Sequence, residues 1–214
     1  VSTDRTSSAY NMLRHAGTSY ALAEAFARFG DPAYRASAER SLDYLVARSE
    51  LREDAGRWGP DYRFVIEDRK AKLGGSALAL LALCQYTETT GDRRYLGRMR
   101  EFARFVVRMQ DEESGKLTSY FDYGPTASVP ADDSIYYPGE SVLALARLYI
   151  LDPDPLWLET ADHAARRLIV ERDGGVEIAQ QPHDHSPLVP CSYLHLLPHH
   201  TTSLDHARKT APAP

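Results

Sequence analysis

A helix–turn–helix unit recurs three times along this chain, and no other feature constrains the fold as strongly. The first helix of each unit contains a glycine near its start, at Gly17, Gly75 and Gly139, about 60 residues apart. The turn between the two helices reads Gly30-Asp31, Gly91-Asp92 or Asp152-Pro153-Asp154. A repeated unit of this kind cannot bury its apolar face alone, so successive units are expected to stack around a shared core. The sequence therefore predicts an all-α protein built from tandem helical hairpins.

The two helices of each unit differ in how their apolar residues are arranged. The first is apolar nearly all round, as in Ala77–Cys84 and Val142–Tyr149, which predicts burial on every side. The second is amphipathic, because its apolar residues recur at steps of three and four. These stripes are Tyr34, Ala38, Leu42 and Leu45; Tyr95, Met99, Phe102 and Val106; and Trp157, Ala161, Ala164 and Leu168. Asp31, Asp92 and Asp154 are expected at the N-cap positions of these second helices.

An inner layer of buried helices inside an outer layer of amphipathic ones is typical of an α/α-toroid, with a stacked α-solenoid as the alternative. The unit length favours the toroid, because common helical repeats are shorter, at ~34 to 47 residues. The extra residues lie in the links that return from an outer helix to the next inner helix. Each link opens with a turn and a short strand-like piece, at 56–58, 115–121 and 174–178. The repeat occupies residues 1–185, and an irregular tail rich in Pro and His follows at 186–214.

The composition excludes several classes of partner. The chain has a formal net charge of −5 and no basic stripe, which argues against nucleic acid or an anionic membrane as a partner. No stretch approaches the ~18 to 20 apolar residues that a membrane span requires. Cys84 lies in an apolar helix and Cys191 in the tail, so neither a disulfide framework nor a metal knuckle is indicated. The first residues do not look like a signal peptide, which slightly favours the cytoplasm and leaves the compartment open.

Ionisable and aromatic residues recur at one phase of the repeat, where each inner helix begins. If the inner helices run parallel, these residues meet at one mouth of the ring, within reach of one ligand. The clusters are Arg14 and His15; Lys72; Asp132, Asp133, Tyr136, Tyr137 and Glu140; and Asp184 and His185. Random surface charge would not follow the repeat, and long loops that are not linkers are usually functional. The mouth is therefore the predicted site.

The carboxylates at the mouth are the candidate catalytic groups for general acid and base chemistry on a glycosidic bond. Glu140 falls in the first turn of a helix, where the macrodipole favours its anion, which suits a base or nucleophile better than an acid. Asp133 lies beside Asp132, and like charges that close can raise the pKa of one of them. Asp184 is the third candidate. A helix-stabilising role for Glu140 and a solvated loop for the aspartates are the alternatives.

The remaining mouth residues are candidates for binding the substrate. Arg14 and Lys72 would bind a carboxylate or a phosphate, and Tyr136 and Tyr137 would stack on sugar rings. His15, Asp132 and His185 complete the predicted binding set. His183-Asp184-His185 does not predict a metal site, because adjacent ligands rarely point at one ion. No Gly-rich phosphate loop and no nucleophile elbow occurs, so no cofactor is expected.

The segments Leu73–Leu78 and Tyr136–Glu140, together with the Gly-Asp turns, resemble the six-hairpin glycosidase-like superfamily over about residues 10 to 185. The superfamily includes glycoside hydrolases, unsaturated-glucuronyl hydrolases, sugar epimerases and non-catalytic proteins. The resemblance implies an α/α-toroid with a carbohydrate-active site at the inner-helix mouth. Such toroids carry about six hairpins, whereas three are visible here and a fourth begins near Asp184. This implies an incomplete, truncated ring, inactive by itself, whose exposed inner helices could self-associate.

The leading hypothesis is a glycoside hydrolase-like or sugar epimerase-like domain that acts on a carbohydrate or another small molecule. A non-catalytic helical-repeat module that binds a glycan or a peptide is the alternative from another class. A toroidal cyclase or prenyltransferase-like enzyme is the third hypothesis. The grouping of Asp132, Asp133 and Glu140 argues against it, because a mouth lined by aromatics without paired carboxylates would then be expected.

Overall fold

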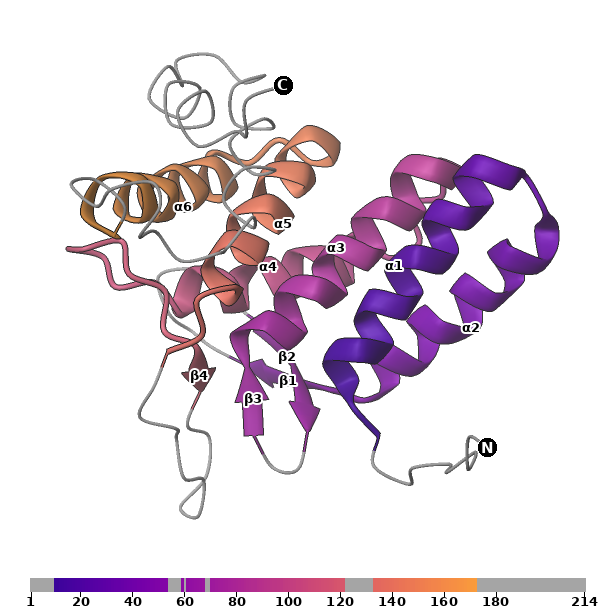
Figure 1. Ribbon diagram of the computed structural model, residues 1–214, viewed down its shortest axis with the longest axis horizontal. Helices are drawn as coiled ribbons and strands as arrows, with labels where there is room; N and C mark the ends of the chain where they lie inside the picture. The colour runs from indigo at the N-terminus through magenta and orange to yellow at the C-terminus, as the bar shows by residue number, and fades with distance from the viewer. Residues whose placement is uncertain (1–9, 54–58, 60, 68–69, 122–132, 173–214) are drawn as a thin grey trace, which may run out of the picture.

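The computed structural model describes residues 10–53, 59, 61–67, 70–121 and 133–172. These residues form six α-helices, four short strands and one π-helical turn (Figure 1). The helices are α1 (Met12–Phe29), α2 (Pro32–Ala47), α3 (Leu73–Thr90), α4 (Leu96–Arg108), α5 (Tyr137–Leu151) and α6 (Pro155–Arg166). The strands are β1 (Ser49–Glu53), β2 (Asp61–Glu67), β3 (Lys70–Lys72) and β4 (Tyr120–Phe121), and the π-helical turn is η1 (Arg167–Arg172).

The helices pair as three hairpins, as the repeat predicts, and the turn residues explain where each helix ends. Gly30 and Gly91 adopt φ values of 68° and 70° after α1 and α3, a left-handed conformation that glycine reaches without strain. Asp31 and Asp154 cap α2 and α6 by accepting from backbone amides two residues ahead. The N-cap prediction for Asp92 is wrong. Helix α4 begins later, at Leu96, and Asp92 accepts from the Arg94 amide in the preceding turn.

The predicted apolar stripes lie in the core, with one exception. Ala38, Leu42 and Leu45 of α2 are fully buried, whereas Tyr34 is exposed at the start of the same helix. All eight stripe residues predicted for the second and third units are buried, although Leu168 lies in η1 rather than in α6. The inner helix α3 is buried on nearly every side from Leu73 to Thr87, as its continuous apolar sequence predicts.

A small antiparallel sheet makes the fold mostly helical rather than all-α, which corrects the sequence prediction. The strand order is β1-β2-β3-β4, with Ser49 opposite Val65, Ile66 opposite Ala71, and Lys72 opposite Tyr120. The piece predicted at 115–121 contributes β4 and an isolated bridge between Gln110 and Leu117. The predicted pieces at 56–58 and 174–178, the tail and its boundary at residue 185 all lie outside the described residues.

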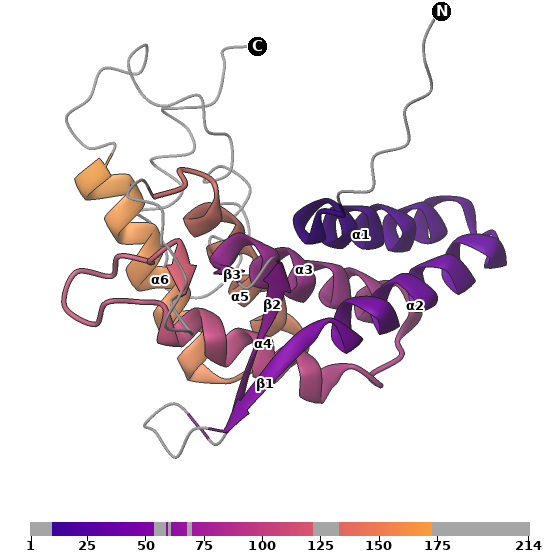
Figure 2. The ribbon, with the colours of Figure 1, turned by 90° about the horizontal axis from the view of Figure 1, so that it is seen from below.

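The first helices of the hairpins, α1, α3 and α5, form one layer in which α3 packs between the other two (Figure 1). Figure 2 shows α2 and α4 lying on the same side of α1 and α3, as an outer layer. The sheet lies at the end where α1 and α3 begin, and β3 continues directly into α3. Among the described helices, none is long and apolar enough to cross a membrane.

Candidate functional site at the amino ends of the inner helices

The amino ends of α1, α3 and α5 lie side by side, and a few close contacts fix them there. The Met12 amide, the first of α1, donates to Glu67 Oε1 at 2.8 Å. The Leu73 amide, the first of α3, donates to the Ser119 carbonyl at 2.9 Å. A Cβ added to Gly74 would lie only 2.2 Å from the Tyr137 ring, so glycine is what lets α5 approach α3 this closely. The three inner helices therefore run parallel, as the sequence analysis assumed.

The other halves of the same helices are also linked, which confirms their common direction. Arg147 of α5 is almost fully buried and donates to Gln85 and Glu88 of α3 and to the Tyr20 hydroxyl of α1. The guanidinium also lies over the Tyr20 ring, with its carbon 5.6 Å from the ring centroid. A buried guanidinium that is shared among three helices holds their spacing, because each lost contact would leave a buried charge uncompensated.

Five half-buried side chains gather at the amino ends, and we call them the amino-end cluster: Glu67, Lys72, Tyr120, Tyr137 and Glu140. They come from β2, β3, β4 and α5. The Tyr120 and Tyr137 rings are 6.4 Å apart in an edge-on arrangement. Burial raises the pKa of the Tyr137 hydroxyl, and the nearby Tyr120, Glu140 and Glu67 add to that rise while Lys72 opposes it. The Tyr137 hydroxyl therefore lies near all three charged members of the cluster, Glu67, Lys72 and Glu140.

Glu67 and Lys72 form an ion pair in this cluster. The Lys72 ammonium donates to Glu67 Oε2 at 2.9 Å, and the two side chains are 26% and 12% exposed. The hydrogen bond to Glu67 raises the pKa of Lys72 despite the partial burial of its side chain. Both carboxylate oxygens of Glu67 are therefore engaged, one by α1 and the other by Lys72.

Glu67 was not predicted as a site residue, because the strand-like piece of the link between α2 and α3 was expected at 56–58 and no strand was expected at Asp61–Glu67. The available signal was the apolar run Phe64-Val65-Ile66, which ends in a carboxylate shortly before an inner helix begins. A charge at the end of a buried strand lies at the edge of the core, where it can reach a neighbouring helix end. The pairing of β2 with β1 and β3 then decides which helix end it reaches.

Glu140 lies in the first turn of α5, as predicted, and one of its carboxylate oxygens, Oε2, is buried. Its backbone amide donates to the Tyr136 carbonyl at 3.1 Å, which anchors the start of the helix. An anion in this position is stabilised by the positive end of the helix macrodipole. The neighbouring Tyr136 is half exposed and Tyr137 is directed to Gly74, so the two tyrosines face different surroundings.

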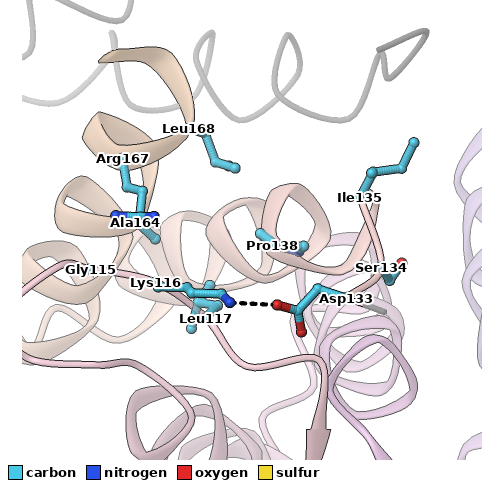
Figure 3. A pocket seen from close by; sticks show the side chains of 10 residues that line it. All are labelled: Gly115, Lys116, Leu117, Asp133, Ser134, Ile135, Pro138, Ala164, Arg167 and Leu168. Carbon is cyan, nitrogen blue, oxygen red and sulfur yellow. Dashed lines mark ion pairs between the residues drawn. The ribbon is translucent and has the colours of Figure 1, made fainter. Parts of the chain in front are cut away.

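Asp133 contacts Ser119, the residue that precedes Tyr120 of the amino-end cluster. It pairs with Lys116 at 2.6 Å and accepts a long hydrogen bond from the Ser119 amide at 3.4 Å (Figure 3). The Lys116 ammonium holds the pKa of Asp133 below its ordinary value. This is opposite to the rise expected from a neighbouring aspartate, because the nearby cation favours the charged form.

Asp133 also lines a pocket of about 280 Å³ between the start of α5 and the end of α6 (Figure 3). The lining residues are Gly115, Lys116, Leu117, Asp133, Ser134, Ile135, Pro138, Ala164, Arg167 and Leu168. Glu140 is not among the described residues that line this pocket. The lining combines apolar residues with the charged side chains of Lys116, Arg167 and Asp133.

Of the other predicted site residues that the structure describes, His15 and Arg14 are not brought into the cluster. His15 points toward α2, where its Nε2 is 2.8 Å from the Ser41 carbonyl and its ring contacts Tyr10 and Tyr44. Arg14 is exposed on the first turn of α1. Asp132, Asp184 and His185 lie outside the described residues. Among the residues that are described, no group of three His, Cys, Asp or Glu side chains could hold a metal ion.

No protein-family profile matches this chain, and no curated protein matches its sequence. Solved structures do match. An α-mannanase of glycoside hydrolase family 76 from Bacteroides thetaiotaomicron superposes with a TM-score of 0.71 at 15% identity, covering 97% of this chain and 58% of its own. A mannanase variant from Salegentibacter sp. HEL1_6, bound to α-1,6-mannotetrose, gives 0.71 at 15% identity, covering 93% and 62%. The chain is structurally similar to the six-hairpin glycosidase-like superfamily.

A cellobiose 2-epimerase from Spirochaeta thermophila shares the fold with a TM-score of 0.57 at 19% identity, covering 95% of this chain and 55% of its own. The likeness therefore extends to two kinds of carbohydrate-active protein, and at these identities it shows the fold alone. The chain spans less than two thirds of the length of each of these three neighbours. The fold likeness favours the toroid over the solenoid alternative.

Proposed function

We propose that this chain forms an arc of a carbohydrate-active α/α-toroid, in which a sugar binds at the amino-end cluster. The observation that carries the proposal is the convergence of α1, α3 and α5, which brings Glu67, Lys72 and Tyr137 together from separate elements. Aromatic rings beside hydrogen-bonding charged groups suit a sugar, which presents apolar ring faces and a rim of hydroxyls. The neighbours of the same fold that hold mannose oligosaccharides support this ligand class.

In a complete site, Glu140 would act as a base or nucleophile, because the helix end favours its anion. Asp133, whose pKa is lowered by Lys116, would likewise be ionised at neutral pH and would not serve as an acid. Two of the neighbouring mannanase structures are inactive variants in which two consecutive aspartates are replaced. Asp132-Asp133 is a consecutive pair in this chain, which makes it the second target for mutagenesis.

A non-catalytic glycan-binding module is the second candidate function, and the short coverage of the neighbours favours it. The chain has three described hairpins and spans 58% and 62% of two mannanases, so an arc of this size would supply only part of a complete site. Such an arc would bind a sugar weakly and would not turn it over. The exposed side of α1 would then be covered by further hairpins or by self-association.

Binding and turnover can be tested separately on the chain as it is. We would titrate it with α-1,6-mannotetrose and with cellobiose, following amide shifts by NMR, and then search for products by chromatography after long incubation. Turnover that falls by at least ~10²-fold in Glu140→Gln would support the enzymatic function, since general acid–base catalysis contributes about that much. Binding without product would support the module. Absence of binding to either sugar would reject the proposal.

A further inference from the structure

Glu67 joins two inner helices through one carboxylate, and this makes its position unusually fixed. Its Oε1 accepts from the first amide of α1, and its Oε2 accepts from Lys72, the residue that precedes α3. The side chain is only 12% exposed. Amides at a helix start are orphan donors with a partial positive charge, so they hold an anion there. Glu67 therefore cannot turn away from Lys72 without uncovering a helix end.

This arrangement changes what Lys72 can bind. A lone lysine at a sugar site is a natural receptor for the carboxylate of a uronic acid. Here the ammonium is already paired with a carboxylate, and Glu140 adds a second negative charge near the Tyr137 ring. Among the described side chains, an anionic ligand that approaches Lys72 would therefore meet the Glu67 carboxylate beside the ammonium. Like charges placed against a ligand are an effective way to reject it.

A neutral sugar meets no such penalty. The ammonium has three donors, and one of them is directed to Glu67, so donors are left for the hydroxyl oxygens of a ligand. The half-buried rings of Tyr120 and Tyr137 offer apolar surface beside these donors.

We infer that Glu67 is a specificity-determining residue, which neutralises Lys72 so that the amino-end cluster accepts neutral sugars and rejects uronic acids. The inference rests on the proposed function and deepens it. It also reverses the expectation, drawn from the sequence, that Lys72 would bind an anionic substrate. Glu67 acts through Lys72 and is therefore a positioning residue rather than a catalytic one.

The test measures the affinity of the full chain for two tetrasaccharides, the neutral α-1,6-mannotetrose and the negatively charged tetragalacturonate. For the unaltered chain we expect the neutral tetrasaccharide to bind at least ~10-fold more tightly at low salt. In Glu67→Gln the amide can still accept hydrogen bonds, but Lys72 becomes an uncompensated cation. The affinity ratio should then shift by at least ~10-fold toward tetragalacturonate, and this gain should shrink as salt is added.

Glu50→Gln is the matched control. Glu50 lies in β1 of the same sheet and pairs with Arg52, so its substitution makes the same change in net charge outside the cluster. We expect its affinity ratio to equal that of the unaltered chain. Thermal melts of both variants would show that the sheet is intact, and a merely structural role for Glu67 would lower the melting temperature without changing the ratio.

Two results would overturn the inference while leaving the proposed function in place: a preference of the unaltered chain for tetragalacturonate, or an unchanged ratio in folded Glu67→Gln. If Glu67→Gln does not fold, the affinity of Lys72→Gln for tetragalacturonate is compared with that of the unaltered chain instead. Loss of tetragalacturonate affinity by ~10-fold or more would then show that Lys72 binds the uronate. Binding of neither sugar by the unaltered chain would reject the proposed function itself, and the inference with it.

Discussion

Helices α1 and α3 have the same length and the same place in the repeat, yet they are buried very differently. Both are 18 residues long, but α3 buries 13 of them and α1 only four. Helix α3 packs between α1 and α5, with α4 and β2 also against it, whereas α1 packs mainly against α2 and α3. The difference shows what a neighbour on each side contributes to an inner helix.

The sequences of the two helices already reflect this difference. Helix α3 is apolar on nearly every side, whereas α1 carries Arg14, Thr18, Ala21 and Glu24 on an exposed stripe. A side of α1 that faced another inner helix in a closed ring would bury this stripe. If the described hairpins form an arc with α1 at one end, substitutions in α3 should cost more stability than matching substitutions in α1.

The largest effect is expected where α3 is most enclosed. Leu80 is fully buried, and Leu80→Ala should lower the free energy of unfolding by about 2–5 kcal/mol, because it removes apolar contacts and leaves a cavity. Leu22 of α1 is only partly buried, so Leu22→Ala should cost clearly less. Urea denaturation of both variants measures the difference. Equal losses would contradict the view that, among the described elements, α1 has a packed neighbour on fewer sides than α3.

The contact of α3 with α5 and α1 is expected to depend on Arg147. Replacing it by methionine leaves Glu88 without its cation, and we expect a loss of about 2–4 kcal/mol, below the cost for fully buried pairs because Glu88 is 29% exposed. Arg100→Met is the control, since its partner Asp152 is paired at the surface by a guanidinium that is 48% exposed. Calorimetric unfolding compares the two. If Arg100→Met lowered the free energy of unfolding as much as Arg147→Met, the buried pair would contribute no more to stability than the surface pair.

A glycine-to-alanine change in α3 should be harmful. At Gly74 the new Cβ would overlap the Tyr137 ring, so Gly74→Ala should destabilise the protein by about 1–3 kcal/mol and push α5 away from α3. The displacement should also weaken sugar binding at the amino-end cluster. Thermal unfolding and the NMR titration report the two effects. A variant with unaltered stability and binding would mean that α3 and α5 approach each other less closely than described.

The matching change in α1 should be mildly favourable. A Cβ at Gly17 would meet nothing within 4 Å, and alanine lowers the entropic cost of forming a helix. Gly17→Ala should therefore stabilise the chain by about 0.5–1 kcal/mol. The same melts measure it beside Gly74→Ala. Destabilisation would indicate that in solution another surface, such as a second copy of this chain, packs closely on α1 at this position.

The sequence was a good guide to structure that depends on local pattern. The stripe Tyr95, Met99, Phe102 and Val106 is buried as a unit, and Gly30 and Gly91 end their helices. Local pattern failed at Asp92, because an aspartate after a Gly turn can cap either the turn or the helix, and here α4 begins only at Leu96. It also failed for β1 and β2, because the strand-like piece of the link between α2 and α3 was expected at 56–58, between the two strands that form.

The sequence indicated at which end of the inner helices charged and aromatic residues gather, but it was a poorer guide to which residues those are. Lys72, Tyr137 and Glu140 occur at the predicted end of the inner helices, whereas His15 turns toward α2 because its ring packs with Tyr10 and Tyr44. A helix residue near an end can point to either neighbour, and the repeat phase does not distinguish them. The catalytic and binding roles given to these residues stay predictions.

The sequence by itself determined the hairpins, their buried and exposed faces, and the end of the molecule at which charged and aromatic residues gather. These follow from periodicity and turn chemistry, which act over a few residues. Only the tertiary structure decided that Lys72 is neutralised by Glu67 and that Asp133 is held by Lys116. The charge that a site presents depends on which side chains meet across elements, and strand pairing and helix packing set those meetings.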